Sequence, residues 1–353
     1  MRIGTRGSAL ALAQAEHVAR LLGAHPPAEL VTITTTGDRA AASLNEQPAE
    51  HHDLDRTPGS PATDRAPQGV VEDKSRWVDT IEQALLAGEI DLAVHSAKDV
   101  PGELAEGLSL LGAPARAPAE DVLCGASALE ALPEGARVGT SSVRRAAQLR
   151  AIREDLEIVS IGGNVDTRLR RLGGRREAGG GRDEDRLHAI VLARAGLVRL
   201  GREDEVGAVL DPARFVPAPG QGVLALEGRA EDARVKEAVA AITDGDTFAC
   251  LHAERALARE LGASCHTPLG AHATPAGCGC LTLRAWVGLP DGSEWISDEL
   301  AETGIRAEGA CLPASVGGFY DPDALGLRVA ERMRSAGAEE LLRRAQEMAV
   351  EHA

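Results

Sequence analysis

Short apolar runs alternate with helix-like patterns along the first third of the chain. The spacing of apolar residues over Ala9–Leu22 predicts a helix with one buried stripe, and the β-branched run Leu30–Thr35 predicts a strand. A helix over Trp77–Leu86 and a strand over Ile90–Val94 follow, and Arg2–Thr5 is a short strand ahead of the first helix. Strands that alternate with helices are typical of doubly wound, parallel sheets.

A second series of the same kind begins near Glu120. Its predicted elements are strands at 136–139, 156–161 and 189–193, a helix at 143–152, and a second helix that follows the turn at 162–164 and runs to Leu172. The last third differs, because a long helix (Phe248–Leu261) precedes a strand-rich stretch (Leu281–Ile296) and a C-terminal helix (Pro322–Met348). We therefore expect an α/β chain of three domains, with two doubly wound lobes and a smaller α+β domain at the C-terminal end.

The boundaries of these domains follow changes in composition. Domain 1 is predicted at 1–115 and 223–240, domain 2 at 120–217 and domain 3 at 244–353, with a Pro- and Gly-rich crossing over 216–222. Residues 45–69 are polar, Pro-rich and aperiodic, which predicts a mobile loop, and residues 173–186 form a second polar excursion.

Composition and charge restrict the class of protein. The chain has 353 residues, 44% of them hydrophobic, and a formal net charge of −16. This acidic balance and an aromatic content of 2% argue against a nucleic-acid binder, which needs a dense basic surface and stacking platforms. The N-terminus lacks the pattern of a signal peptide, and no apolar stretch reaches the roughly 18 residues of a membrane span. The six sparse cysteines are typical of reduced thiols in the cytoplasm; Cys278 and Cys280 lack the partners of a zinc site, so no metal is expected.

Basic residues nevertheless gather in one stretch. Residues 137–176 hold ten arginines against four acidic residues, whereas residues 38–73 hold three against eight. Three predicted strand-to-helix turns, at 4–8, 139–145 and 163–168, combine hydroxyl or amide side chains with arginine. Such turns suit anions, because helix N-termini and guanidinium groups both donate hydrogen bonds to them, but ordinary helix caps with solvated arginines are the alternative. Ligands of open α/β sheets bind at the carboxyl ends of strands, so three turns of this kind indicate an extended polyanion.

Two more groups have chemistry of their own. Lys98 and Asp99 follow a predicted strand, where a carboxylate can handle a cationic or N–H-bearing substrate while the lysine holds an anion. A structural ion pair is the alternative. Cys265 lies in a loop of small residues after a long helix, and its alternative is a buried, unreactive thiol.

Together these segments resemble the signature blocks of the hydroxymethylbilane synthases, also called porphobilinogen deaminases. The seven blocks, in the order of the family, are TRGSALALAQA, DLAVHSAKDVP, VGTSSVRRAAQL, GNVDTRLRRL, LARAGLVRLG, VPAPGQGVLALEGR and ERALARELGASCHTPLGAHA. The resemblance implies two lobes like those of periplasmic binding proteins around a cleft, and a third domain with the cysteine loop. It also implies a transferase of tetrapyrrole and heme biosynthesis. Such an enzyme joins four porphobilinogen molecules head to tail, releases ammonia each time and yields 1-hydroxymethylbilane.

The resemblance also implies roles for individual residues, by matching position. Cys265 would carry a dipyrromethane cofactor in thioether linkage, and Asp99 would contact pyrrole N–H groups and stabilise the cation formed on deamination. Carboxylates of the cofactor and substrate would be bound by Arg6, Ser8, Lys98, Thr140, Ser142, Arg144, Arg145, Arg168 and Arg199. Gln14 would line the cleft, and Gln221 would be structural or substrate-facing. A lid over about 40–76 would include Lys74, with Trp77 in place of the family's aromatic residue.

The chain departs from the family pattern in four places. The lid is enlarged and reads DKSRW where the family has Gly-Lys-Gly-Leu-Phe, and the 173–186 excursion is longer than usual. Gly162 stands where a basic residue is expected, and the cysteine loop reads ASCHTP where the family has Gly-Gly-Cys-Gln-Val-Pro. These changes bear on carboxylate binding and turnover more than on fold or cofactor attachment. We hypothesise that Arg170 or Arg171 partly replaces the charge missing at Gly162.

Two other functions stay open on the sequence. A non-catalytic small-anion binding protein on the same two-lobed scaffold would have no covalent cofactor, and a degenerate paralogue would hold the cofactor but elongate weakly. The resemblance further implies a cytoplasmic monomer whose partner is the small molecule porphobilinogen, without nucleic acid or membrane.

Overall fold

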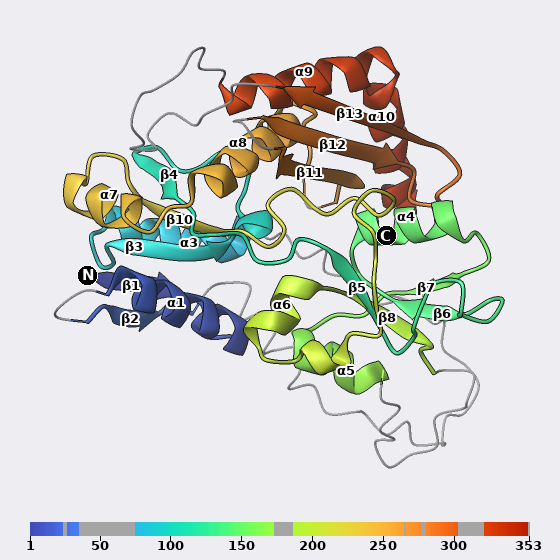
Figure 1. The fold of residues 1–353 in the computed structure, drawn as a ribbon, viewed down its shortest axis with the longest axis horizontal. Helices are drawn as coiled ribbons and strands as arrows, with labels where there is room; N and C mark the ends of the chain where they lie inside the picture. Colours follow the sequence, from blue (N-terminus) through green and yellow to red (C-terminus); the bar gives the residue numbers. More distant parts are fainter. Residues whose placement is uncertain are drawn as a thin grey trace, which may run out of the picture.

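The described part of the chain is built on three sheets (Figure 1). The computed structural model describes residues 1–23, 27–34, 75–172, 186–264, 266–276, 280–302 and 321–351. Lys74 and Cys265 lie outside these residues, as do most of the predicted lid and nearly all of the 173–186 excursion.

Lobe 1 is built on a five-stranded sheet with the order β2-β1-β3-β10-β4. Its strands are β1 (Arg2–Thr5), β2 (Glu29–Thr32), β3 (Leu92–Ser96), β4 (Leu108–Gly112) and β10 (Leu224–Arg229). Its helices are α1 (Ala9–Leu22), α3 (Ser75–Leu86) and α7 (Ala233–Ala240). Successive side chains of a strand point to opposite faces, so Leu92 and Val94 of β3 pack with α1 and α7 while Ala93 packs with α3.

Lobe 2 repeats this plan with the strand order β7-β6-β8-β5-β9. Its strands are β5 (Asp121–Cys124), β6 (Arg137–Gly139), β7 (Glu157–Val159), β8 (Ala189–Ala193) and β9 (Ala208–Val209). Its helices are α4 (Val143–Ile152), α5 (Val165–Leu172) and α6 (Arg194–Arg199). Here β8 alternates in the same way, since Val191 packs with α4 while Ile190 and Leu192 pack with α5 and α6.

The two lobes are linked by one antiparallel strand in each sheet. Strand β5 enters lobe 2 from lobe 1 and pairs antiparallel with β8 and β9, and β10 returns to lobe 1 and pairs antiparallel with β3 and β4. The other strand pairs of the two sheets are parallel. The expected parallel, doubly wound sheets are therefore present, and each contains one reversed strand that the sequence pattern did not indicate.

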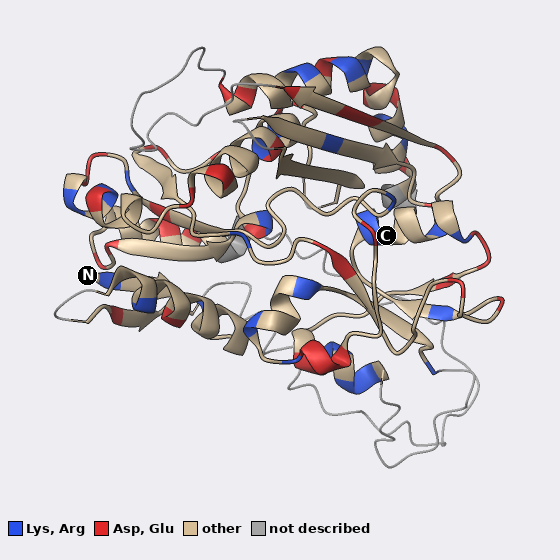
Figure 2. Ribbon diagram, viewed as in Figure 1, with Lys and Arg blue, Asp and Glu red and all other residues tan. Residues whose placement is uncertain are grey.

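Domain 3 is an antiparallel meander covered by three helices. Strands β11 (Leu269–Pro275), β12 (Leu281–Gly288) and β13 (Trp295–Glu302) pair in chain order. Helices α8 (Gly245–Glu260), α9 (Pro322–Ser335) and α10 (Ala338–Glu351) pack with the sheet in one core. Basic and acidic segments alternate along its outer helices (Figure 2), so charge on this domain is largely interspersed.

The single C-terminal helix predicted over 322–348 is wrong. The chain breaks it between α9 and α10 at Gly337, whose φ of 99° lies in the left-handed region that L-residues rarely adopt. The strand-rich stretch predicted over Leu281–Ile296 is confirmed: it holds β12 and the start of β13, and the turn between them contains Gly292 at φ 75°.

Domain 3 joins the two lobes unequally. Lobe 1 residues such as Ala97, Val100 and Val223 lie in the same hydrophobic core as the helices and sheet of domain 3. Lobe 2 meets domain 3 through a smaller cluster formed by Ala147, Val216 and Trp286, with Ala151 against it. Apolar burial stabilises a contact roughly in proportion to its area, so lobe 1 and domain 3 form the more firmly joined pair.

Candidate active site

The return segment, residues 216–223, lies where the lobes and domain 3 meet. Gly220 has a φ of 72°, and a Cβ placed on it would lie 2.9 Å from Ala97 Cβ and 3.1 Å from Lys98 N. A side chain there would therefore displace the turn that carries Lys98 and Asp99. The amide of Ala97 donates a 3.0 Å hydrogen bond to Val223 O, which fixes the same turn from the other side.

Lys98 and Asp99 stand on a single 3-10 turn, η1 (Ala97–Asp99), directly after β3. Both side chains are half-buried. In the preceding strand, His95 Nε2 lies 2.9 Å from Glu227 Oε2 of β10, and both side chains are almost completely buried. The turn itself stands at the carboxyl end of the central strand β3, where ligands of such sheets bind.

Arg144 and Arg145 differ from the sequence expectation. The sequence placed them as ligands of carboxylates, whereas the structure buries both guanidinium groups on Asp121 at the start of β5. Arg144 also donates to Val216 O (2.6 Å) and Arg145 to Val191 O (3.1 Å). Burial would raise the pKa of the Asp121 carboxyl, but the charges and hydrogen bonds of the two arginines outweigh it and lower the pKa to about 2.

Gln221 has a structural position. Its Nε2 donates to Ala119 O (2.6 Å) and to Asp121 Oδ1 (3.0 Å), so it joins the outward segment (residues 113–120) to the arginine pair of lobe 2. The amide of Ala117 donates to Gly222 O at 3.1 Å, which places the outward and return segments side by side. Gln221 therefore belongs to the frame of the site, which was one of the two roles left open for it.

Arg199, in lobe 2, reaches the same crossing from the other side. Its Nη2 donates a 2.6 Å hydrogen bond to Gly222 O, and burial lowers its pKa to about 10, so it stays protonated at neutral pH. A Cβ on Gly196 would lie 3.9 Å from Leu10 Cδ2, so α6 packs against α1. Gln14 of α1 donates to Ser96 Oγ at 2.9 Å, next to the turn of Lys98.

Two of the predicted hydroxyl residues, Ser8 and Ser142, cap helices, which was the alternative to binding an anion. Ser8 accepts from Ala11 N at the start of α1, and Ser142 accepts from Arg145 N at the start of α4. Thr140 is buried and its Oγ1 accepts from Ser142 N at 3.2 Å. A cap of this kind stabilises a helix by about 1 kcal/mol, which accounts for Ser8 and Ser142 without a ligand, while Thr140 holds the turn before α4.

Arg6 and Arg168 stand at the other strand-to-helix turns. Arg6 follows β1 and is half-buried. Arg168 lies one turn into α5, and its Nε donates to Gly163 O at 2.9 Å. Gly162, exposed at the start of this turn, has open space where a Cβ would lie. Arg170 donates to Thr167 Oγ1 at 3.2 Å, so its guanidinium lies over the same turn.

The cofactor and lid predictions fall partly outside the described residues. Cys265 itself is not described, but Ser264 N and Thr267 Oγ1, which flank it, form a 2.8 Å hydrogen bond just after α8. Trp77 lies in α3, and nothing further is described of its side chain. Within the described residues, no group of three or more His, Cys, Asp or Glu side chains could hold a metal ion. No helix in the described part of the chain is long and apolar enough to span a membrane.

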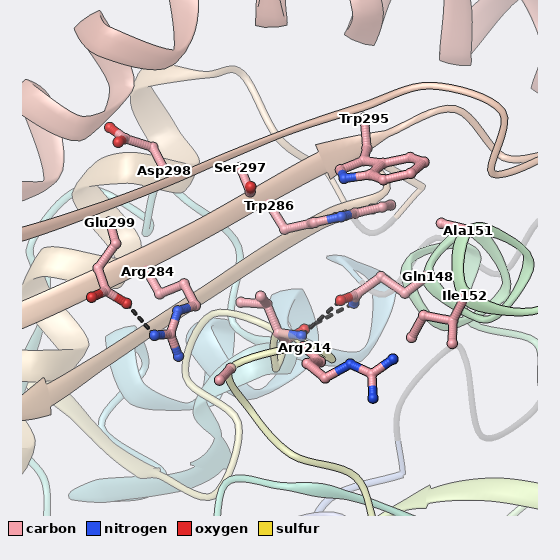
Figure 3. A pocket seen from close by; sticks show the side chains of 12 residues that line it. Gln148, Ala151, Ile152, Arg214, Arg284, Trp286, Trp295, Ser297, Asp298 and Glu299 are labelled. Carbon is pink, nitrogen blue, oxygen red and sulfur yellow. Dashed lines mark hydrogen bonds and ion pairs between the residues drawn. The ribbon is translucent and has the colours of Figure 1, made fainter. Parts of the chain in front are cut away.

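A cavity of about 400 Å³ lies elsewhere, between α4 and the β12–β13 hairpin (Figure 3). Trp286 and Trp295 line it, and Arg284 beside them is paired with Glu299. None of the predicted site residues lines this cavity. The candidate site is therefore defined by the convergence of strand ends on the return segment.

Comparisons with known proteins decide the family. Residues 1–237 match the family model of the porphobilinogen deaminase dipyromethane cofactor binding domain, and residues 248–335 match that of the porphobilinogen deaminase C-terminal domain. The chain belongs to the porphobilinogen deaminase family. The porphobilinogen deaminase of Deinococcus deserti is 43% identical over 90% of this chain and 93% of its own. That of Stenotrophomonas maltophilia is 43% identical over 97% of this chain and 98% of its own.

Among solved structures, the methionine binding protein MetQ is 12% identical and covers 69% of this chain and 89% of its own, with a TM-score of 0.37. For this member of the porphobilinogen deaminase family, the doubly wound fold is established by the strand order of the two lobe sheets.

Sequence reasoning missed the residues that hold the site together. Glu254 of α8 is fully buried and accepts hydrogen bonds from Gly220 N (2.6 Å), Ala273 N (2.7 Å) and Arg116 Nη1 (2.6 Å). Asp121 plays the corresponding part in lobe 2. The ERALAREL block of the family contains Glu254, but no local pattern distinguishes a buried acidic residue from a solvated one on a helix.

Proposed function

We propose that this enzyme joins four porphobilinogen molecules head to tail, with loss of ammonia at each step, to give 1-hydroxymethylbilane. The family match supports the reaction class, and the observation that carries the site assignment is the convergence of both lobes on the return segment beside Lys98 and Asp99. Dipyrromethane is the cofactor of this family, and Cys265 is the residue proposed to bind it.

The residues around the return segment suit a dipyrromethane and its carboxylates. Arg6 and Lys98 directly follow strand ends of lobe 1, Arg168 lies one turn into α5, and Arg199 ends α6 beside the return segment. Such cations bind carboxylates with charge-assisted hydrogen bonds. The buried Nε of Arg144 has no hydrogen-bond partner among the described residues, so the network retains one unused donor. The bound cofactor would supply the pyrrole carbon to which the first substrate is joined.

Asp99 is proposed as the catalytic carboxylate. Its position at a strand end, half-buried beside Lys98, lets it accept hydrogen bonds from pyrrole N–H groups. As ammonia leaves, positive charge develops on the substrate, and a preorganised carboxylate stabilises that charge. Ser8 and Ser142 are proposed to act as helix caps whose turns face the ligand, and Thr140 to hold the turn before Ser142. Arg144 and Arg145 are proposed to set the frame of the lobe 2 side. Lys74 and Trp77 remain proposed lid residues.

The finer assignments are proposals of the same kind. The three domains are placed at 1–115 with 223–240, at 120–217 and at 244–353, and the sheet membership of β10 supports including the second segment in domain 1. We propose a cytoplasmic monomer without nucleic-acid or membrane partners.

Intact-mass spectrometry tests the proposal most directly. The purified protein should carry the mass of one dipyrromethane, absent from Cys265→Ser, and incubation with porphobilinogen should release 1-hydroxymethylbilane. Asp99→Ala should keep the fold and lose turnover, because the charge on the departing substrate is no longer stabilised.

Two other results would each reject the proposal. A folded, unmodified protein from a host that makes porphobilinogen would indicate the small-anion binding protein. A modified protein that consumes almost no porphobilinogen would indicate a weakly active paralogue.

A further inference from the structure

One arginine of domain 3 binds the backbone that follows Asp99. Arg255, on α8, donates Nη1–H to Val100 O (3.3 Å) and Nη2–H to Pro101 O (2.7 Å) and to Gly102 O (2.9 Å). Three successive carbonyl groups of lobe 1 therefore share one guanidinium of domain 3. Only arginine presents several N–H donors in a rigid plane, so this contact is specific to the residue type.

Packing around Arg255 makes the contact a fixed one. Burial lowers its pKa to about 10, so the group is still charged at neutral pH. A Cβ on Gly102 would lie 3.2 Å from Arg259 Cγ, so the backbone at 102 runs close against α8. Val100 lies in the core that lobe 1 shares with domain 3. The loop is thus held by both apolar and polar contacts on one side.

The same helix leads to the cofactor cysteine. Helix α8 ends at Glu260, five residues before Cys265, and Glu254, the neighbour of Arg255, holds Gly220 N of the return segment. One helix therefore contacts the Asp99 turn, the return segment and the start of the cysteine loop. Glu254 and Arg255 are neighbours on α8: Glu254 accepts from Gly220 N, and Arg255 donates to the carbonyl groups of residues 100–102.

We propose that Arg255 is a positioning residue that keeps the Asp99 turn in fixed register with the domain that carries Cys265. The inference rests on the proposed function, since it assumes that Asp99 and Cys265 serve the same reaction. Arg255 contacts backbone carbonyls of residues 100–102, so it acts through the turn that ends at Asp99. Lobe 2, which has the smaller contact with domain 3, is then the part free to shift as the product lengthens.

The test compares Arg255→Ala and Arg255→Lys with Arg332→Ala, a control in domain 3. Arg332 also donates two hydrogen bonds, both to the carboxylate of Asp298, which lies in domain 3 like Arg332 itself. Arg255→Ala should lower kcat by about tenfold or more with KM within about threefold, because a small misplacement of a reacting group is costly while binding groups are unchanged. Arg255→Lys should recover part of the loss, and Arg332→Ala should behave as the unaltered enzyme.

Hydrogen exchange separates positioning from general stability. The amide of Val100, which donates to Ala97 O at 3.2 Å, should exchange faster in Arg255→Ala while amides of α8 keep their protection. Unchanged exchange at Val100 would overturn the proposal whatever the activity, and so would normal kcat with faster exchange. If Arg255→Ala does not fold, kcat, KM and the exchange of the Val100 amide are compared between Arg255→Lys and the unaltered enzyme.

The two proposals can fail separately. An unaltered protein without dipyrromethane and without turnover rejects the proposed function, while the exchange measurement still reports whether Arg255 holds the turn.

Discussion

Arg116 and the fully buried Glu254 form an ion pair, 2.6 Å from Nη1 to Oε1, that fastens the outward segment to domain 3. Arg116 also donates its Nε to Gln221 O at 2.9 Å, so the pair includes the return segment as well. One carboxylate thus satisfies donors from three separate stretches of chain, which makes it a structural centre of the site.

Glu254→Ala should be strongly destabilising. It leaves the Arg116 charge and the amides of Gly220 and Ala273 without their acceptor, and breaking a buried pair in this way costs about 3–5 kcal/mol. Urea unfolding followed by circular dichroism measures the loss. The matched control is Glu260→Ala on the same helix, whose pair with Arg334 is exposed and should contribute at most about 1 kcal/mol. Equal losses in the two variants would contradict the assignment.

The Asp121 carboxyl should make stability depend on pH in the acid range. Its pKa of about 2 in the folded protein lies below the ordinary value of 3.8, so its contribution is complete above about pH 4 and is lost as pH falls toward 2. The gap in unfolding free energy between the unaltered protein and Asp121→Asn should narrow by about 2 kcal/mol between about pH 6 and the acid end of that range. Asp204→Asn, at an exposed position, is the control and should show no such narrowing. A constant gap would exclude an ionised Asp121 as the anchor of Arg144 and Arg145.

Gly162→Arg should be tolerated and should strengthen substrate binding. A Cβ at this position meets no atom within 4 Å, so stability should change by no more than about 0.5 kcal/mol. The added cation stands at the turn where carboxylates are expected, so KM for porphobilinogen should fall severalfold while kcat changes little.

The neighbouring glycine provides the control for this change. Gly163 has a φ of 96°, and a Cβ on it would lie 2.8 Å from Thr167 Cγ2, so Gly163→Arg should destabilise by about 1–3 kcal/mol. Comparable stability of the two variants would show that the backbone of this turn is not as described.

Replacing both Arg170 and Arg171 with alanine should slow elongation if they supply the charge missing at Gly162. Arg170 lies over the turn through Thr167, and Arg171 is exposed on the same helix. Quenched-flow analysis of enzyme intermediates should show slower addition in the double variant and recovery when Gly162→Arg is added. Unaltered elongation would reject this compensation.

The sequence pattern predicted correctly those helices whose ends are set by neighbouring residues. Helices α1 and α4 have the predicted bounds, because an apolar stripe and a serine cap determine them over a few residues. Strand β10 was not predicted, because its pairing with β3 and β4 depends on residues more than 100 positions away. The break at Gly337 was missed because a glycine inside a helical pattern is often tolerated.

The candidate site likewise contains residues that sequence motifs identify and residues that they do not. The family resemblance named Asp99, Lys98 and Cys265 from motifs, whereas the partners of Arg144 and Arg145 could not be found from motifs. Asp121 is more than 20 residues from either arginine, and nothing local shows that all three are buried. Burial and distant pairing are properties of the folded chain, so basic motifs alone could not separate arginines of the frame from those that face a ligand.

The return of the chain to lobe 1 at β10 has a consequence for folding during synthesis on the ribosome. The five strands described for the sheet of lobe 2 lie within residues 121–209, so this sheet can close as soon as that stretch has emerged. Lobe 1 begins at the N-terminus, yet β10, at 224–229, must enter between β3 and β4 to complete it. The first lobe to be translated is therefore the second to finish folding, and until then the unpaired edges of β3 and β4 are exposed in the nascent chain.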